Sequence, residues 1–255
     1  MGLFGTPQHP ASPSDAKPES QTVDDDFELL NVFTAFSVNN QIGLSDEVKK
    51  QFKEAQDNLS EWQAWEAKTI EDAVAGKVKT GELPQDKSVP SALRRNGYRA
   101  VVAKAYREHS AWLIGTSVES STSNLTGRRE QAASVIARSV TTILPLAFQQ
   151  IKVIVYPLVR SLMDEATNKR VFALTFVRHD YDETARNVRT TIWQLSLDVS
   201  VTAGADSKQV EASIKHSLTS SNFSHTQWEK NSNAIQKSVI EAGKEIVPRF
   251  TLNLA

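Results

Sequence analysis

Residues 192 to 201 read Ile-Trp-Gln-Leu-Ser-Leu-Asp-Val-Ser-Val, and this stretch decides the fold class. Successive side chains of a strand point to opposite sides, so its strict alternation predicts a β-strand with two different faces. The apolar face carries Trp193, Leu195, Leu197, Val199 and Val201. The polar face carries Gln194, Ser196, Asp198 and Ser200. Such a strand either covers a soluble core or turns its apolar face to lipid, because about ten residues also suffice to cross a bilayer.

Other stretches around this one have strand character. Val171 to Val177 is rich in β-branched and aromatic residues, and the polar segment 178–190 is expected to join it to the Ile192 strand as a long-looped hairpin. Pro248 to Leu254 alternates again and predicts a closing strand. Ile151 to Tyr156 has strand composition, whereas residues 156–166 suit either structure. Residues 27–36 fit a short helix or a strand equally well.

Helical spacing marks several further segments. An amphipathic helix is predicted from the N-cap Ser45 to near Gly76, and two more over residues 93–107 and from Arg129 to Pro145. A fourth helix, capped by Asp206, is expected to carry Val210, Ile214 and Leu218. Thr226 and Glu229 form a capping box for a fifth helix, which passes Ile235 and Val239 and ends at Gly243. Residues 77–90 are expected to form a loop, and the small, polar residues 115–127 a mobile one.

Composition divides the 255 residues into a tail and a core-forming part. Residues 1–26 are rich in Pro and Ser and contain the acidic run 24–26, which predicts disorder. The remaining residues, 27–255, are expected to form a single α+β domain, since 40% hydrophobic content is enough for a core. In this domain amphipathic, mainly antiparallel strands are covered by several amphipathic helices.

The sequence offers little for catalysis. The chain has no cysteine, which excludes disulfides, thiolate metal sites and a thiol nucleophile. Histidines with metal-ligand spacing and glycine-rich phosphate loops are also absent. The best catalytic candidate is the cluster Arg178-His179-Asp180-Tyr181-Asp182, but neighbours on extended backbone point apart, and a solvated hairpin loop explains it as well. We therefore expect no enzyme, no catalytic residues, no metal and no cofactor.

Two features point towards membranes. The N-terminus, Met1 to Thr6, fits the pattern for myristoylation at Gly2. A single acyl chain binds weakly, so stable anchoring needs a second signal such as a basic surface. The helix over residues 93–107 offers one, as a candidate lipid-binding set of Arg94, Arg95, Arg99, Lys104 and Arg107. The alternative for this set is a helix face that pairs with the chain's own carboxylates.

Location and charge limit the other binding classes. There is no run of 18 to 20 apolar residues for a membrane-spanning helix and no signal peptide, so a cytoplasmic protein is expected. A basic surface from the arginines of residues 94–99 and 128–129 with Trp112 would suit nucleic acid. The formal net charge of −1 and the acidic tail argue against that reading, and no nucleic-acid partner is expected.

Together these features resemble the pore-forming module of gasdermin-like cell-death proteins, in the short fungal version that ends without an inhibitory C-terminal domain. The resemblance covers roughly residues 27–255. It rests on size, on the mixed order of helices and strands, on the amphipathic segments 171–177 and 192–201, and on the basic helix. A chain that ends on the 248–254 strand agrees with it. Other α/β cytolysins, in which helices cover an amphipathic sheet, fit about as well.

The resemblance implies a soluble monomer that moves from the cytoplasm to the plasma membrane. There it would bind acidic phospholipids, form a homo-oligomer and insert amphipathic β-hairpins, causing lytic cell death, with an activating protein as a further partner. The side chains expected to meet lipid are Phe172, Leu174, Phe176, Trp193, Leu195, Leu197 and Val199. The alternative is a soluble, non-enzymatic interaction or scaffold protein whose strands cover a conventional α+β core, and alternation by itself does not separate the two.

Overall fold

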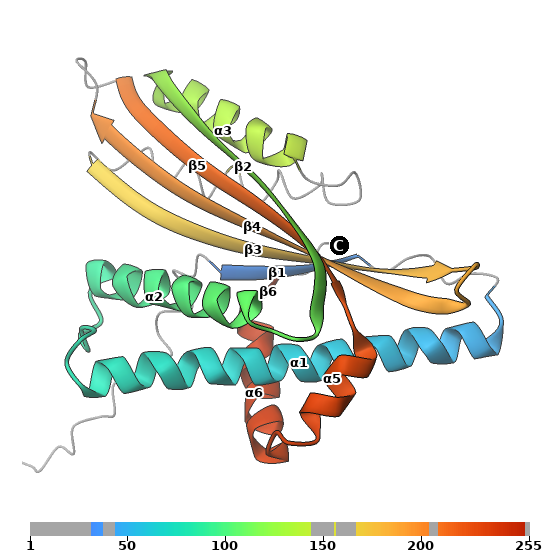
Figure 1. Cartoon of the computed structure of the whole chain (residues 1–255). Coiled ribbons are helices and arrows are strands. Elements are labelled where there is room, and N and C mark those ends of the chain that lie inside the picture. The colour runs from blue at the N-terminus through green and yellow to red at the C-terminus, as the bar shows by residue number, and fades with distance from the viewer. Residues whose placement is uncertain (1–31, 38–43, 144–155, 157–166, 204–208, 253–255) are drawn as a thin grey trace, which may run out of the picture.

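The computed structural model describes residues 32–37, 44–143, 156, 167–203 and 209–252. Within them the chain forms five helices and six strands, and all six strands belong to one sheet with the order β2-β5-β4-β3-β1-β6 (Figure 1). The fold class is therefore α+β, as predicted. The elements in chain order are β1 (Val32–Ser37), α1 (Asp46–Lys79), α2 (Val89–Glu108), β2 (Leu113–Arg128), α3 (Arg129–Ile143), β3 (Thr167–Asp182), β4 (Asn187–Ala203), β5 (Gln209–Phe223), α5 (His225–Ser232), α6 (Lys237–Phe250) and β6 (Thr251–Leu252).

The sheet is antiparallel through its four long strands. β2 pairs with β5, β5 with β4 and β4 with β3, all antiparallel, whereas β1 is parallel to both β3 and β6. The β3–β4 register sets Phe176 opposite Trp193 and Leu174 opposite Leu195. Directly opposed residues share a face of the sheet, so the apolar sets of the two strands combine into one surface.

Helices cover the two faces of the sheet at different places. The helix α3 packs against β2 and β5 on one face, while the long helix α1 and its neighbours α2 and α5 lie under the other face (Figure 1). The helix α6 packs on α1 at a close crossing, where a Cβ on Gly243 would overlap the carbonyl of Ala64. A glycine is required there because any side chain would push the two helices apart.

Most of the strongly periodic segments are confirmed. α1 begins after Ser45, whose side chain accepts a hydrogen bond from the backbone N–H of Val48 at 3.3 Å. α2 and α3 occupy the two further predicted helices, and β3 and β4 contain the predicted strands. The open assignment at 27–36 is decided for its described part, since β1 is a strand that pairs with β3.

The helix predicted around Val210 is wrong, because these residues form the strand β5. Val210, Ile214 and Leu218 are four residues apart, and a spacing of four puts side chains on one face of a strand as well as of a helix. Ala212, buried between the first two, reveals the period of two. The proposed cap Asp206 lies outside the described residues.

The loop predicted at 115–127 is also wrong, because it belongs to β2. Its small, polar side chains reflect an edge position: β2 bonds to β5 along one side and is exposed along most of its length. The register shifts between Ile114 and Ser117, next to Gly115, whose φ of 64° is the left-handed conformation that glycine adopts readily.

Three C-terminal and hairpin boundaries need correction. The predicted closing strand is mostly helix, since α6 continues through Phe250 and only Thr251–Leu252 form β6. The predicted single helix up to Gly243 divides into α5 and α6, and α5 is capped by Ser224, which accepts a hydrogen bond from Gln227 N–H. The long hairpin loop at 178–190 is instead a tight turn over residues 183–186, because the polar residues on either side continue the ladder of β3 and β4.

The remaining predictions fall outside the described residues. They concern the tail 1–26 with its candidate acylation site Gly2, the helix end at Pro145, and the segments 151–155 and 157–166.

Candidate functional site

The residues predicted to meet lipid share one face of the sheet. Leu174 and Phe176 of β3 and Leu195, Leu197 and Val199 of β4 are all buried, and Trp193 is half-buried against them. Phe172 lies on β3 directly opposite Leu197. The structure therefore brings the predicted set together, as the continuous apolar face of two neighbouring strands.

Where it continues over β5, this apolar face is covered by α3, and Tyr156 packs against the same cluster. The helix contributes small side chains to the shared cluster, which lets its backbone approach the sheet; they are Ala132, Ala133 and Ala137, with Ile136 as the largest. The strand β5 extends the same cluster through Val210, Ala212, Ile214 and Leu218. The face is thus a three-strand apolar surface, of which the part over β5 lies under a short amphipathic helix.

The opposite face of the same strands is polar. Gln194, Ser196, Asp198 and Ser200 of β4 are partly exposed, and Asp198 stands directly opposite Lys215 of β5. A shallow hollow of about 530 Å³ lies on this part of the sheet, lined by serines of β2, β4 and β5 together with these two charged groups. The part of this face that lies over α1 is apolar, because Val177 and Ile192 contact Trp62 there.

The five basic residues predicted to bind lipid point in two different directions in the structure. Arg94 and Lys104 are exposed on α2, but Arg95, Arg99 and Arg107 are turned inward. Arg95 donates hydrogen bonds to the carbonyls of Pro84 and Asp86, at 2.5 and 2.9 Å. In this structure the five basic residues therefore do not form one lipid-facing surface.

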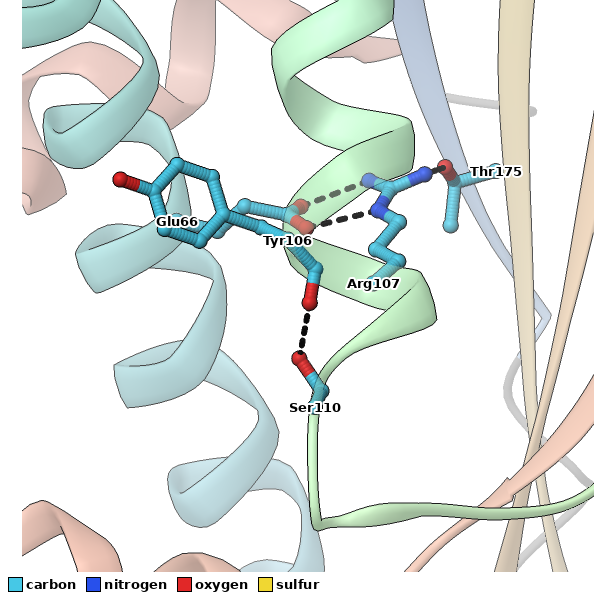
Figure 2. A network of polar contacts seen from close by, with 5 residues as sticks. All are labelled: Glu66, Tyr106, Arg107, Ser110 and Thr175. Atoms are coloured by element: carbon cyan, nitrogen blue, oxygen red, sulfur yellow. Dashed lines mark hydrogen bonds and ion pairs between the residues drawn. The ribbon is translucent and has the colours of Figure 1, made fainter.

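Two of the inward arginines join α2 to α1 through carboxylates. Arg99, which is fully buried, makes a bidentate pair with Glu71 at 2.6 and 2.8 Å and also donates to the Asn96 side chain. Figure 2 shows the second pair, in which Arg107 holds Glu66 with two bonds of 2.6 Å and reaches Thr175 of β3 at 2.8 Å. Paired bidentate contacts of this kind fix geometry as well as charge.

For Arg99 and Arg107 the structure therefore agrees with the alternative to lipid binding, in which the helix pairs with the chain's own carboxylates. The signal was present in the sequence, since Glu66 and Glu71 lie on the preceding helix and Arg99 and Arg107 on the following one. Two helices joined by a short loop run antiparallel, so their matching charges meet in reverse order. What the sequence could not provide was the rotation of α2 that turns its arginines inward.

The cluster at residues 178–182 lies on β3 and is divided between the two faces. Arg178 and Asp180 form an ion pair at 2.6 Å on one side. His179 points to the other side and is buried, with its Nδ1 atom 2.8 Å from the hydroxyl of Thr190. The same hydroxyl lies 2.8 Å from Nε2 of His225 at the start of α5. A threonine shared by two imidazoles joins the sheet to α5.

Burial dominates the electrostatics of this histidine pair. It lowers the pKa of His179 to about 4, with His225 adding repulsion and Asp180 opposing the shift. Burial also lowers the pKa of His225, against the attraction of Glu229. The hydroxyl donates its one proton to only one of the two rings, so the other ring donates its own N–H to the Thr190 oxygen. The only hydroxyl that these contacts bring to the rings is that of Thr190, which is fully buried and out of reach of a substrate, so the geometry is that of a structural link.

An aromatic cluster that sequence patterns did not indicate lies beneath the sheet. Four of the five tryptophans, Trp62, Trp65, Trp112 and Trp228, meet there with Phe223. Trp65 and Trp112 have ring centroids 5.4 Å apart, and Trp112 and Trp228 5.1 Å, both nearly edge to face. These residues come from α1, the turn before β2, β5 and α5, so no local spacing could reveal them.

The described part of the chain offers neither a metal site nor a membrane-spanning helix. Among the residues placed by the structure, no group of three or more His, Cys, Asp or Glu side chains could hold a metal ion. No helix formed by those residues is long and apolar enough to cross a membrane.

Comparisons with known proteins add little to this geometry. No protein-family model matches the chain, and no curated protein matches it. Among solved structures it is similar to one described as the structure of the Evf virulence factor, with a TM-score of 0.41 and 12% sequence identity, over 86% of this chain and 80% of that chain. Similarity at this level carries no argument about the function of this chain.

Proposed function

We propose that this chain is a membrane-binding, pore-forming protein, which oligomerises on acidic phospholipids and inserts the two-faced strands β3, β4 and β5. The observation that carries the proposal is the contrast between the two faces of this sheet. One face is continuously apolar and buried, with α3 over its β5 side, while the other is polar around Ser196 and Asp198 and partly open to solvent there.

The strand lengths are compatible with insertion. β2, β3, β4 and β5 have 16, 16, 17 and 15 residues, whereas about 9–11 residues cross the hydrocarbon layer. In lipid every backbone polar group must be paired, and the antiparallel ladder from β2 to β3 already pairs them along the inner strands. Insertion would preserve these pairs and exchange only the contacts of the apolar face.

The step that insertion requires is removal of α3. Among the α3 side chains whose burial is described, the fully buried contacts are three alanines and Ile136, with Ile143 partly buried, so small side chains make up most of this contact. Burial of apolar surface stabilises in proportion to the area, so a helix that buries mainly alanines is held less tightly than one that buries leucines. Lipid would take the place of α3 on the apolar face, and the serine-rich face would line the water-filled side.

The exposed edge of β2 favours a second candidate function, that of an interaction or scaffold protein. β2 is long, and among the described strands only β5 pairs with it, so its other edge presents free backbone donors and acceptors. Such an edge can accept a strand from another chain. In a pore former the same edge would join neighbouring subunits.

Dye release from liposomes tests the proposed function. The full chain is added to vesicles of phosphatidylcholine with or without phosphatidylserine, and its folding is confirmed by circular dichroism. Pore formation predicts release that depends on phosphatidylserine. A folded protein that releases no dye from either vesicle would contradict the proposal and leave the interaction protein as the better reading.

A further inference from the structure

The outer surface of α2 has an unusual distribution of side chains. Its inward stripe carries Arg95, Arg99 and Arg107, which are held by carbonyls and by the glutamates of α1. Its outward stripe carries Val101, exposed at 63%, and Tyr106, exposed at 39%. Helices on protein surfaces normally bury their apolar side and expose their charges, and α2 does this only in part.

The outward residues are aligned along the helix. Arg94, Tyr98, Val101 and Ala105 follow one another at intervals of four, three and four residues, which places them on one face. Tyr98, Val101 and Ala105 border a shallow apolar hollow of about 490 Å³ together with Ala73 of α1. Basic groups flank this surface, with Arg94 at one end and Lys104 beside Val101, and both side chains are exposed.

We infer that this outer face of α2, formed by Arg94, Tyr98, Val101, Lys104, Ala105 and Tyr106, docks onto an acidic membrane surface. Valine can enter the boundary between headgroups and acyl chains, and tyrosine rings favour the same depth because they are apolar with a polar tip. Arginine and lysine reach from that depth to anionic headgroups.

The position of the basic side chains favours a lipid surface over a protein as the partner of this face. The basic groups lie at the rim of the apolar face and not within it, which suits a flat surface whose negative charges surround an apolar interior. Glu108 is the acidic exception on this stripe and lies 3.7 Å from Lys104. Its removal should therefore strengthen docking, which is a result that a purely structural role would not give.

The docking surface does not depend on the inward arginines for contact with lipid. They act as positioning residues, because their buried pairs with Glu66 and Glu71 hold α2 in one rotation. The inference rests on the proposed function for the nature of its partner, but docking and pore formation are separate steps and can be measured separately.

Co-sedimentation of the full chain with vesicles of phosphatidylcholine and phosphatidylserine tests the inference. Val101→Glu should weaken binding by more than about tenfold, because one valine side chain contributes on the order of 1.5 kcal/mol when it leaves water, equal to about one decade of affinity, and the new carboxylate is repelled by the anionic surface. Val118→Glu on β2 is a matched control, since Val118 is also 63% exposed and lies outside the surface. Glu108→Gln should strengthen binding about fivefold, from about 1 kcal/mol per charge at such a surface.

The outcomes separate this inference from the proposed function. Reduced binding by Val101→Glu but not by Val118→Glu supports docking through α2, even if the wild type releases no dye. Equal binding by the folded Val101→Glu protein and the wild type overturns it, even if both release dye, and so does an equal loss in both valine variants. A folded wild type that binds neither this vesicle nor one of phosphatidylcholine alone also overturns it.

Discussion

At the scale of single residues, loss of the ion pair between Arg107 and Glu66 is expected to lower the free energy of unfolding strongly. It is nearly buried and joins α1, α2 and β3 through one guanidinium (Figure 2). Removal of one member of such a pair leaves an uncompensated buried charge, whereas removal of both does not. The pair therefore specifies the rotation of α2 as well as contributing to stability.

Arg107→Ala is expected to lower the free energy of unfolding by about 3–5 kcal/mol, since Glu66 then remains buried and unpaired. The double variant Arg107→Met with Glu66→Leu should recover most of that loss, because both charges are gone and the apolar volume is kept. Urea unfolding followed by tryptophan fluorescence measures both. A double variant as unstable as the single one would refute the ion-pair explanation.

The shared threonine at His179 and His225 predicts an acid-sensitive link between the sheet and α5. Both imidazoles have a lower pKa in the folded protein than the usual 6.5, so the unfolded chain binds more protons than the folded chain as the pH falls. Their contribution to stability is complete above about pH 6.5 and is lost as the pH falls towards the His179 pKa of about 4. Asp180 and Glu229 oppose this effect without removing it.

Thermal unfolding between pH 7 and pH 4.5 measures this sensitivity. The wild type should lose melting temperature across that interval, and a His179→Gln, His225→Gln variant should lose less, because it has no imidazole to protonate at the link. Parallel curves for the two proteins would show that other groups cause the acid sensitivity.

At the scale of elements, prediction from sequence succeeded where one period was long and unambiguous. The helix α1 shows many apolar residues at intervals of three and four, and β4 alternates over ten residues, so neither has a competing reading. The prediction for β5 was wrong because its large apolar residues are four apart, a spacing that fits both the helical and the strand period. The loop predicted in place of β2 was wrong because an edge strand that is exposed on both faces needs no apolar residues.

The candidate site was predicted only in part for a related reason. The apolar face of β3 and β4 follows from local alternation, and the structure places its residues together. The inward turn of Arg95, Arg99 and Arg107 depends on where α1 sets its glutamates, which is a relation between two helices. The histidine link and the tryptophan cluster depend on long-range contacts and leave no pattern along the chain.

The helix α3 provides the element-scale test of the proposed mechanism. Ile136 is its largest buried side chain on the sheet, so Ile136→Ala should weaken its attachment by up to about 2–4 kcal/mol. If displacement of α3 precedes insertion, this variant should release dye faster than the wild type from vesicles with phosphatidylserine. Val135→Ala, on the exposed side of the same helix, is the matched control and should leave the rate unchanged. Slower release by a folded Ile136→Ala protein would count against displacement.

At the scale of the whole molecule, the proposed function requires one sheet face to have two partners in turn. In the structure the apolar face of β3, β4 and β5 is buried, and α3 is its partner over β5. At the membrane the partner would be lipid, while the serine-rich side of the same strands would meet water. The exchange keeps the strand pairing and changes the surroundings of alternate side chains, so it can be followed at neighbouring positions of β4.

The most direct measurement uses the absence of cysteine, which makes any introduced cysteine a unique labelling site. Trp193→Cys and Gln194→Cys lie next to each other on opposite faces of β4, and neither side chain is fully buried. Each variant carries an NBD fluorophore and is mixed with vesicles that contain phosphatidylserine and nitroxide-labelled lipid. Insertion of β4 predicts strong quenching by the nitroxide lipid at position 193 and little at position 194. Equal quenching at the two positions, or none at either while the protein is bound, would contradict insertion of this strand.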